Sequence, residues 1–111
     1  MLAKKYRLRR KSEFAYIYRK GKAFHTKYLT MIIVPTKSKI SKIGFSVSNK
    51  VGNSIIRHKV KRRLSEIVRK RISKLPIKNY IFVAKNESSS LSFVELEKEV
   101  DILLTKVEYE K

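Results

Sequence analysis

Six cationic side chains crowd the stretch from residue 50 to residue 63, which reads KVGNSIIRHKVKRR. They are Lys50, Arg57, Lys59, Lys61, Arg62 and Arg63. A glycine turn opens here onto a helix, whose first turn has unpaired N–H groups and a partial positive charge. Cations at this end oppose the helix dipole and cost helix stability. The chemistry that this pattern favours is therefore the binding of an anion, above all phosphate.

The spacing of these cations supports the same chemistry. Two pairs lie four residues apart and project from neighbouring rows of the helix: Arg57 with Lys61, and His58 with Arg62. The Arg57 side chain is expected to be exposed. A merely solvated face normally mixes charges, whereas Glu66 is the only acid between positions 14 and 86. Phosphate binding is thus favoured over a surface that only keeps the chain soluble.

Groups for autonomous catalysis are not assembled by the sequence. His25 and His58 have no acid nearby, and seven of the nine acids fall after position 86. The acids on the last helix are expected on its solvated face: Glu95, Glu97, Glu99 and Asp101. Paired carboxylates for two-metal hydrolysis, a Walker loop and a dinucleotide fingerprint are missing, and there is no cysteine for zinc or thiol chemistry. We expect neither a self-sufficient enzyme nor a metal bound by the protein.

Composition points to a single basic domain. The chain has 111 residues, 42% of them hydrophobic, and a formal charge of +19. Residues 1–86 carry 25 basic and 2 acidic side chains, so the charge is polarised toward an anionic partner such as nucleic acid. No apolar run approaches the roughly 20 residues that span a bilayer, and the basic N-terminus lacks the apolar stretch of a signal peptide. We expect a cytoplasmic protein with no membrane partner.

The elements that must position these residues alternate between helix and strand. Residues 1–11 form a basic arm, expected to be flexible until RNA is bound, and Ser12 is expected to cap a short helix ending at Gly21. Strands are expected at residues 28–34, 42–48 and 79–85, with one more between 22 and 27. In the strand at 42–48, Ile43, Phe45 and Val47 alternate onto one face. Ser54 is expected to cap the basic helix, whose buried stripe would be Ile56, Val60, Leu64, Ile67 and Val68. Ser92 and Glu95 predict a capping box before the last helix. The fold class is α+β, a small mixed sheet packed by helices, in one domain over residues 1–111.

Three aromatic residues add a second signal. Phe14 and Tyr18 lie on the first helix, and Tyr28 begins a strand. Aromatic faces can stack on unpaired bases of single-stranded RNA. An aromatic residue taken alone is more often part of the core. The sequence therefore leaves both roles open for each of the three, packing in the core and stacking on RNA bases.

The stretch FSVSNKVGNSIIRHKVKRRLSE resembles the signature of the protein subunit of bacterial ribonuclease P. The segments LRRKSEFAYIYRKGKAF, NYIFVAKN and LSFVELEKEVDILL resemble the family's flanking regions, so the likeness covers nearly the whole chain. It implies a small basic partner of a catalytic RNA, which with Mg²⁺ removes the 5′ leader of precursor tRNA. It also implies a fold like ribosomal protein S5 domain 2, with a left-handed βαβ crossover.

The resemblance also assigns roles to residues. Contacts with the catalytic RNA are implied for Lys50, Arg57, His58, Lys61 and Arg62. A cleft for the single-stranded leader is implied for Phe14, Tyr18, Tyr28, Ser46 and Ser48. The chain departs from the family pattern at His58, where asparagine is usual, at Asn49 for lysine and at Asn79 for aspartate. None of these changes removes the basic surface.

Two alternatives come from other classes. A structural ribosomal or general RNA-binding protein would share the size, charge and topology but would need no aromatic cleft. A helix-turn-helix DNA-binding protein would need a short helix before the recognition helix, where this sequence predicts a strand.

Overall fold

The computed structural model describes residues 2–108 and has three α-helices and a four-stranded sheet within them. The helices are α1 Lys11–Lys20, α2 Ser54–Arg69 and α3 Phe93–Glu108. The strands are β1 Lys22–His25, β2 Leu29–Pro35, β3 Lys42–Val47 and β4 Lys78–Ala84. Short 3-10 turns are η1 Lys4–Tyr6, η2 Asn49–Val51, η3 Ile72–Lys74 and η4 Asn86–Ser90. The predicted α+β class is confirmed, and β1 is the additional strand expected between residues 22 and 27.

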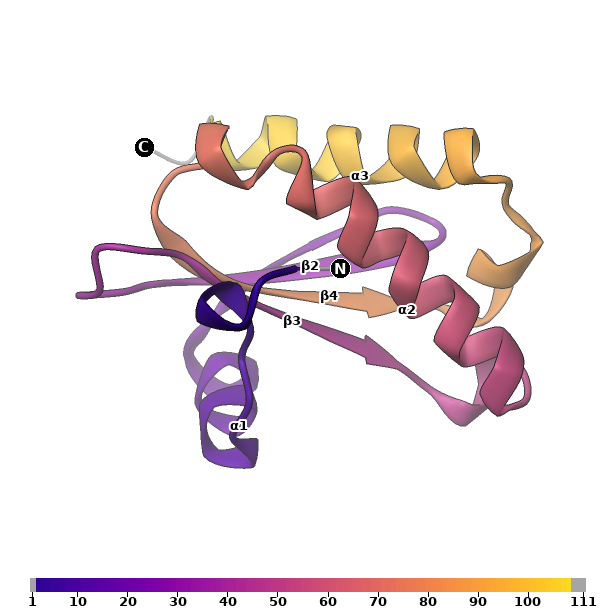
Figure 1. Ribbon diagram of the computed structural model, residues 1–111, viewed down its shortest axis with the longest axis horizontal. Helices are drawn as coiled ribbons and strands as arrows, with labels where there is room; N and C mark the ends of the chain where they lie inside the picture. The colour runs from indigo at the N-terminus through magenta and orange to yellow at the C-terminus, as the bar shows by residue number, and fades with distance from the viewer. Residues whose placement is uncertain (1, 109–111) are drawn as a thin grey trace.

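The sheet is mixed and has the order β1-β2-β4-β3. β2 pairs antiparallel with both β1 and β4, whereas β3 pairs parallel with β4. A parallel pair needs a crossover, and here α2 supplies it between β3 and β4. Figure 1 shows α2 and α3 over one face of the sheet and α1 against the other. The handedness of the crossover stays a prediction.

Alternation along the strands divides the apolar residues between two cores. Toward α2 and α3, Ile43, Tyr80 and Phe82 pack with the buried stripes of both helices. Toward α1, a smaller cluster joins Leu8, Ile17, Ile32, Val34 and Ile81. β2 is buried on both faces from Leu29 to Val34, as expected of a strand between two layers.

The helix starts differ from those predicted. Asn53, and not Ser54, caps α2, since its side-chain Oδ1 accepts the Ile56 N–H at 3.0 Å. α1 begins at Lys11 with Arg10 as its cap, so Ser12 is already helical. The reason is Glu13, whose carboxylate accepts the backbone N–H of Arg10 at 3.2 Å and closes the first turn. The capping box of α3 is confirmed, with Ser92 and Glu95 exchanging hydrogen bonds of 2.9 and 3.1 Å.

The N-terminal segment, expected as a flexible arm, lies against the domain. Leu2 and Leu8 are buried, and Leu8 N–H donates to the Ile43 carbonyl at 3.0 Å along the open edge of β3. Arg7 Nε donates to the Leu2 carbonyl at 2.8 Å, which folds the segment back on itself. Its behaviour before RNA binds stays a prediction.

Candidate nucleic-acid interface

The turn between β3 and α2 sets the direction of the basic helix. Gly52 has a φ of +157°, a value that side-chain-bearing residues rarely adopt, and a Cβ there would lie 2.9 Å from Ile56 Cγ2. Asn53 then starts the helix, and its carbonyl accepts the Arg57 N–H at 2.9 Å. The first turn of α2 is thereby held beside the end of β3.

A hollow of ≈ 400 Å³ lies between β3 and this first turn. Its lining is Phe45, Ser46, Val47, Ser54, Arg57, His58 and Lys61. Three residues predicted to contact the catalytic RNA therefore line the same hollow as Ser46, which was predicted for the leader cleft. The three are Arg57, His58 and Lys61. The lining contains no acidic side chain, so the hollow combines hydroxyl donors with cationic groups. Hydroxyl and cationic N–H groups are the donors from which a phosphate oxygen accepts hydrogen bonds.

Arg57 is less exposed than predicted. Its side chain is half-buried, and its Nε is fully buried with no hydrogen-bond partner among residues 2–108. A buried N–H group without a hydrogen-bond partner lowers the stability of the fold. Such groups are found at functional sites among other places. The buried Nε fixes the start of the guanidinium beside the hollow that Arg57 lines.

The other predicted RNA contacts lie around this hollow. Arg62 is exposed on another side of α2, where it lines a hollow of ≈ 390 Å³ with Lys59, Arg63, Glu66 and Phe93. Lys50 is exposed in η2, before the helix. The basic surface thus extends around the first half of α2. Ile56, expected in the buried stripe, is 38% exposed, because the first turn of α2 reaches beyond the end of β3 (Figure 1).

Phe14 packs directly on β3. It is half-buried, and a Cβ on Gly44 would lie 2.5 Å from Phe14 Cζ, so the ring needs glycine beneath it. The next residue on the same side of β3 is Ser46, which pairs with Val83, and Val83 in turn pairs with Thr30. The sheet face beyond Phe14 therefore runs across Ser46, Val83 and Thr30.

Tyr28 and Ser48 are not gathered around Phe14, whereas Tyr18 lies one turn further along α1. Tyr18 is 47% exposed on α1, whereas Tyr28 is half-buried and packs against the larger core. Ser48 lines a separate hollow of ≈ 450 Å³ at the end of the sheet, together with Lys27, Val83 and Lys85. Of the five candidates, Phe14 and Ser46 share one part of the sheet face, and Tyr28 and Ser48 lie toward its far end.

Two acids predicted on a solvated face have internal partners instead. Arg71 donates to Asp101 at 2.6 Å and to Glu97 at 2.9 Å, linking the end of α2 to α3. The bond to Asp101 raises the pKa of Arg71 most, partial burial lowers it, and the bond to Glu97 raises it further. Sequence reasoning missed this link because position 71 is 30 residues from position 101.

The described part of the chain contains no cluster of three metal-ligating side chains and no helix long and apolar enough to cross a membrane. The acids do not converge beside the basic hollow. Within residues 2–108, this surface presents cations and hydroxyls suited to anions, and the Phe14 ring, which is suited to stacking with another flat ring.

Comparison with known proteins identifies the family. A sequence model of the family described as Ribonuclease P matches residues 2–108. The "Ribonuclease P protein component" of Clostridium novyi (strain NT) is 36% identical over 108 residues, covering 95% of this chain and 96% of that protein. The protein of the same name from a Nitratiruptor species is 35% identical over 104 residues, covering 94% of each. The chain therefore belongs to the family of ribonuclease P protein components.

Solved structures agree with this fold. A Staphylococcus aureus RNase P protein mutant with defective mRNA degradation activity superposes with a TM-score of 0.90 at 24% identity, covering 95% of this chain and 90% of that one. The RNase P protein from Thermotoga maritima superposes with a TM-score of 0.83 at 24% identity, covering 91% and 96%. At this identity the likeness concerns the fold.

Proposed function

We propose that this chain is the protein subunit of a ribonuclease P, binding the catalytic RNA and the 5′ leader of precursor tRNA. The observation that carries the proposal is the hollow between β3 and α2, which is lined by Arg57 and Lys61 and contains no acid. The family match supports the catalytic RNA and precursor tRNA as the partners. Such partners are expected in the cytoplasm.

Cleavage itself is assigned to the RNA subunit. Hydrolysis by the protein would need carboxylates or histidines converging on a metal or water, and Glu97 and Asp101 are instead paired with Arg71. Mg²⁺ is expected to bind with the RNA subunit. The protein's own contribution is to bind phosphates beside α2. The cations there reduce the repulsion between the phosphate groups of the two RNAs.

The leader is proposed to lie on the sheet face beside Phe14. The ring offers a partly exposed aromatic surface on which an unpaired base can stack, and Ser46 offers a hydroxyl beside it. Tyr18, exposed on the same helix, extends this surface. Tyr28 and Ser48 would contact the leader only where the strand continues toward the end of the sheet.

The test is cleavage of a precursor tRNA at low Mg²⁺, with catalytic RNA alone and with this protein added. Cleavage at the mature 5′ end that needs both components is the expected result. A protein that binds both RNAs but never restores cleavage would be a ribosomal or general RNA-binding protein instead.

A further inference from the structure

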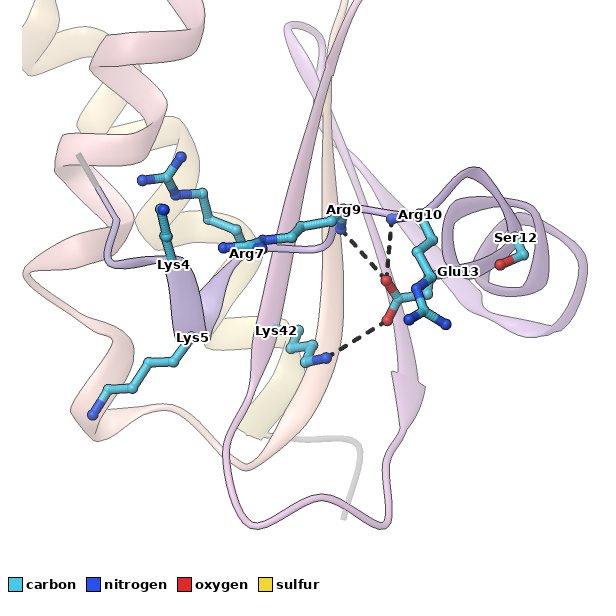
Figure 2. A pocket seen from close by; sticks show the side chains of 8 residues that line it. All are labelled: Lys4, Lys5, Arg7, Arg9, Arg10, Ser12, Glu13 and Lys42. Atoms are coloured by element: carbon cyan, nitrogen blue, oxygen red, sulfur yellow. Dashed lines mark hydrogen bonds and ion pairs between the residues drawn. The ribbon is translucent and has the colours of Figure 1, made fainter.

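A second basic hollow lies at the other end of β3, away from the residues assigned above. Its volume is ≈ 520 Å³ and it sits where the N-terminal segment leaves the edge of β3 and enters α1. Its lining is Lys4, Lys5, Arg7, Arg9, Arg10, Ser12, Glu13 and Lys42. Six of these eight side chains are cations, five from the N-terminal segment and the sixth, Lys42, from β3 (Figure 2).

The single acid of this hollow is already engaged. Glu13 accepts the backbone N–H groups of Arg9 and Arg10 at 3.4 and 3.2 Å, and Lys42 Nζ lies 3.8 Å from its carboxylate (Figure 2). Burial alone would raise the pKa of Glu13, but these N–H groups and the charge of Lys42 hold it below the ordinary value. The carboxylate thus organises the turn, and most of the positive charge around it is left unbalanced.

The segment that carries these cations is anchored, so they converge on one place. Leu2 and Leu8 are buried, and Arg7 forms a bridge with Ile43 on β3. By contrast, the side chains of Lys4 and Arg9 are exposed and form no hydrogen bond or ion pair with any residue from 2 to 108. Like charges held together in this way repel one another, and an anion would relieve that repulsion.

Shared lining residues connect this hollow to the one beside α2. A small pocket of ≈ 100 Å³ lies between them along β3. Arg7 lines this pocket and the N-terminal hollow, while Phe45 and Lys61 line it and the hollow beside α2. Cations therefore follow the edge of β3 from Lys42 to Val47, a distance of roughly 17 Å at the usual rise of a strand.

We propose that the N-terminal hollow is a second phosphate site, which binds phosphodiester groups of an RNA strand through Lys4, Arg9, Arg10 and Lys42. The identity of that RNA rests on the proposed function; the site itself rests on the charges and the anchored segment. The two possible sources of the phosphates, the RNA subunit and the leader, carry the same chemistry and are separated by experiment.

The test uses the double variant Lys4→Gln/Arg9→Gln. It removes two positive charges without breaking a hydrogen bond or ion pair within residues 2–108. The matched control is Lys74→Gln/Lys98→Gln, an equal loss of charge at exposed positions that do not line the hollow. Melting temperatures of both variants should equal that of the wild type. Affinity is measured against salt concentration, because the logarithmic slope becomes shallower by about 1 for every phosphate that the protein no longer neutralises.

Two RNAs are titrated with the full-length proteins. One arm uses the catalytic RNA alone; the other adds precursor tRNA, with a long or a short leader, to the assembled complex. We expect Lys4→Gln/Arg9→Gln to flatten the slope by ~1 to 2 and to weaken binding roughly 10-fold in one arm, which identifies the source. The control should leave both slopes unchanged, and Arg9→Lys should retain wild-type binding.

Two results would overturn the site. In the first, the variant and the control lower affinity equally, so that only net charge matters; in the second, neither changes the slope in either arm. Both are distinct from failure of the proposed function, which would appear as a wild-type protein that never restores cleavage.

Discussion

The two long helices on one face of the sheet are equal in length but differ in whether their charged side chains have partners within the protein. α2 and α3 each have 16 residues and bury an apolar stripe in the larger core. On α3, Glu97 and Asp101 hold Arg71, and Glu95 closes the first turn. On the first half of α2, Arg57 and Lys61 have no carboxylate partner within residues 2–108. Charges on α3 therefore stabilise the fold, whereas those at the start of α2 are available to a partner.

The largest effect should come from removing cations at the start of α2. Arg57→Ala/Lys61→Ala is expected to weaken binding of the catalytic RNA about 100-fold, roughly 2.7 kcal/mol, with little change in melting temperature. The measurement is a filter-binding titration at fixed salt. Lys98→Ala on α3 serves as control and should bind as the wild type does. A large drop in melting temperature would instead make Arg57 a structural residue.

Breaking the link between the helices should affect stability and not binding. Arg71→Met leaves Glu97 and Asp101 without their partner, and we expect a loss of about 1 kcal/mol, since the pairs are only partly screened by solvent. Urea denaturation followed by circular dichroism measures it. Arg69→Met, which removes an exposed pair with Glu66 inside α2, should cost much less. Equal losses in the two variants would mean that the link does not join the helices energetically.

The two N-caps allow a closer comparison. Asn53→Ala and Ser92→Ala each remove one side-chain hydrogen bond from a helix start, and each should cost about 1 kcal/mol. Because the first turns of α2 carry cations proposed to bind RNA, only Asn53→Ala should also weaken RNA binding. Parallel melting and RNA titrations test this. A matching loss of binding in Ser92→Ala would show that stability alone limits binding.

The smallest effect concerns acidification of α3. The backbone N–H of Ser92, and then its hydroxyl, hold the pKa of Glu95 below its ordinary value. A carboxyl whose pKa is lower in the folded state stabilises the protein above its unfolded pKa, near 4.5. That contribution disappears as pH falls through the folded pKa. The melting-temperature difference between wild type and Glu95→Gln should therefore shrink on acidification below about pH 4.5; a constant difference would contradict the assignment.

Local patterns were enough to predict most elements. The alternation of Ile43, Phe45 and Val47 was confirmed as the core side of β3, and the Ser92–Glu95 capping box was confirmed at α3. These signals depend on residues within a few positions of one another, so the sequence contains the whole interaction. The family resemblance, carried by the stretch around the first turn of α2, was confirmed as well.

Features that depend on distant partners were not predictable in this way. Arg71 meets Asp101 across 30 positions, and the N-terminal segment pairs with Ile43 although its sequence reads only as a basic run. Likewise, Arg57 was expected to be exposed, but its Nε is buried, and its side chain shares a hollow with residues of β3. The sequence by itself determined the charge, the helix and strand segments and the family. Only the tertiary structure decided which cations face one another along β3 and which are paired, because burial and pairing are set by segments that meet only in the folded chain.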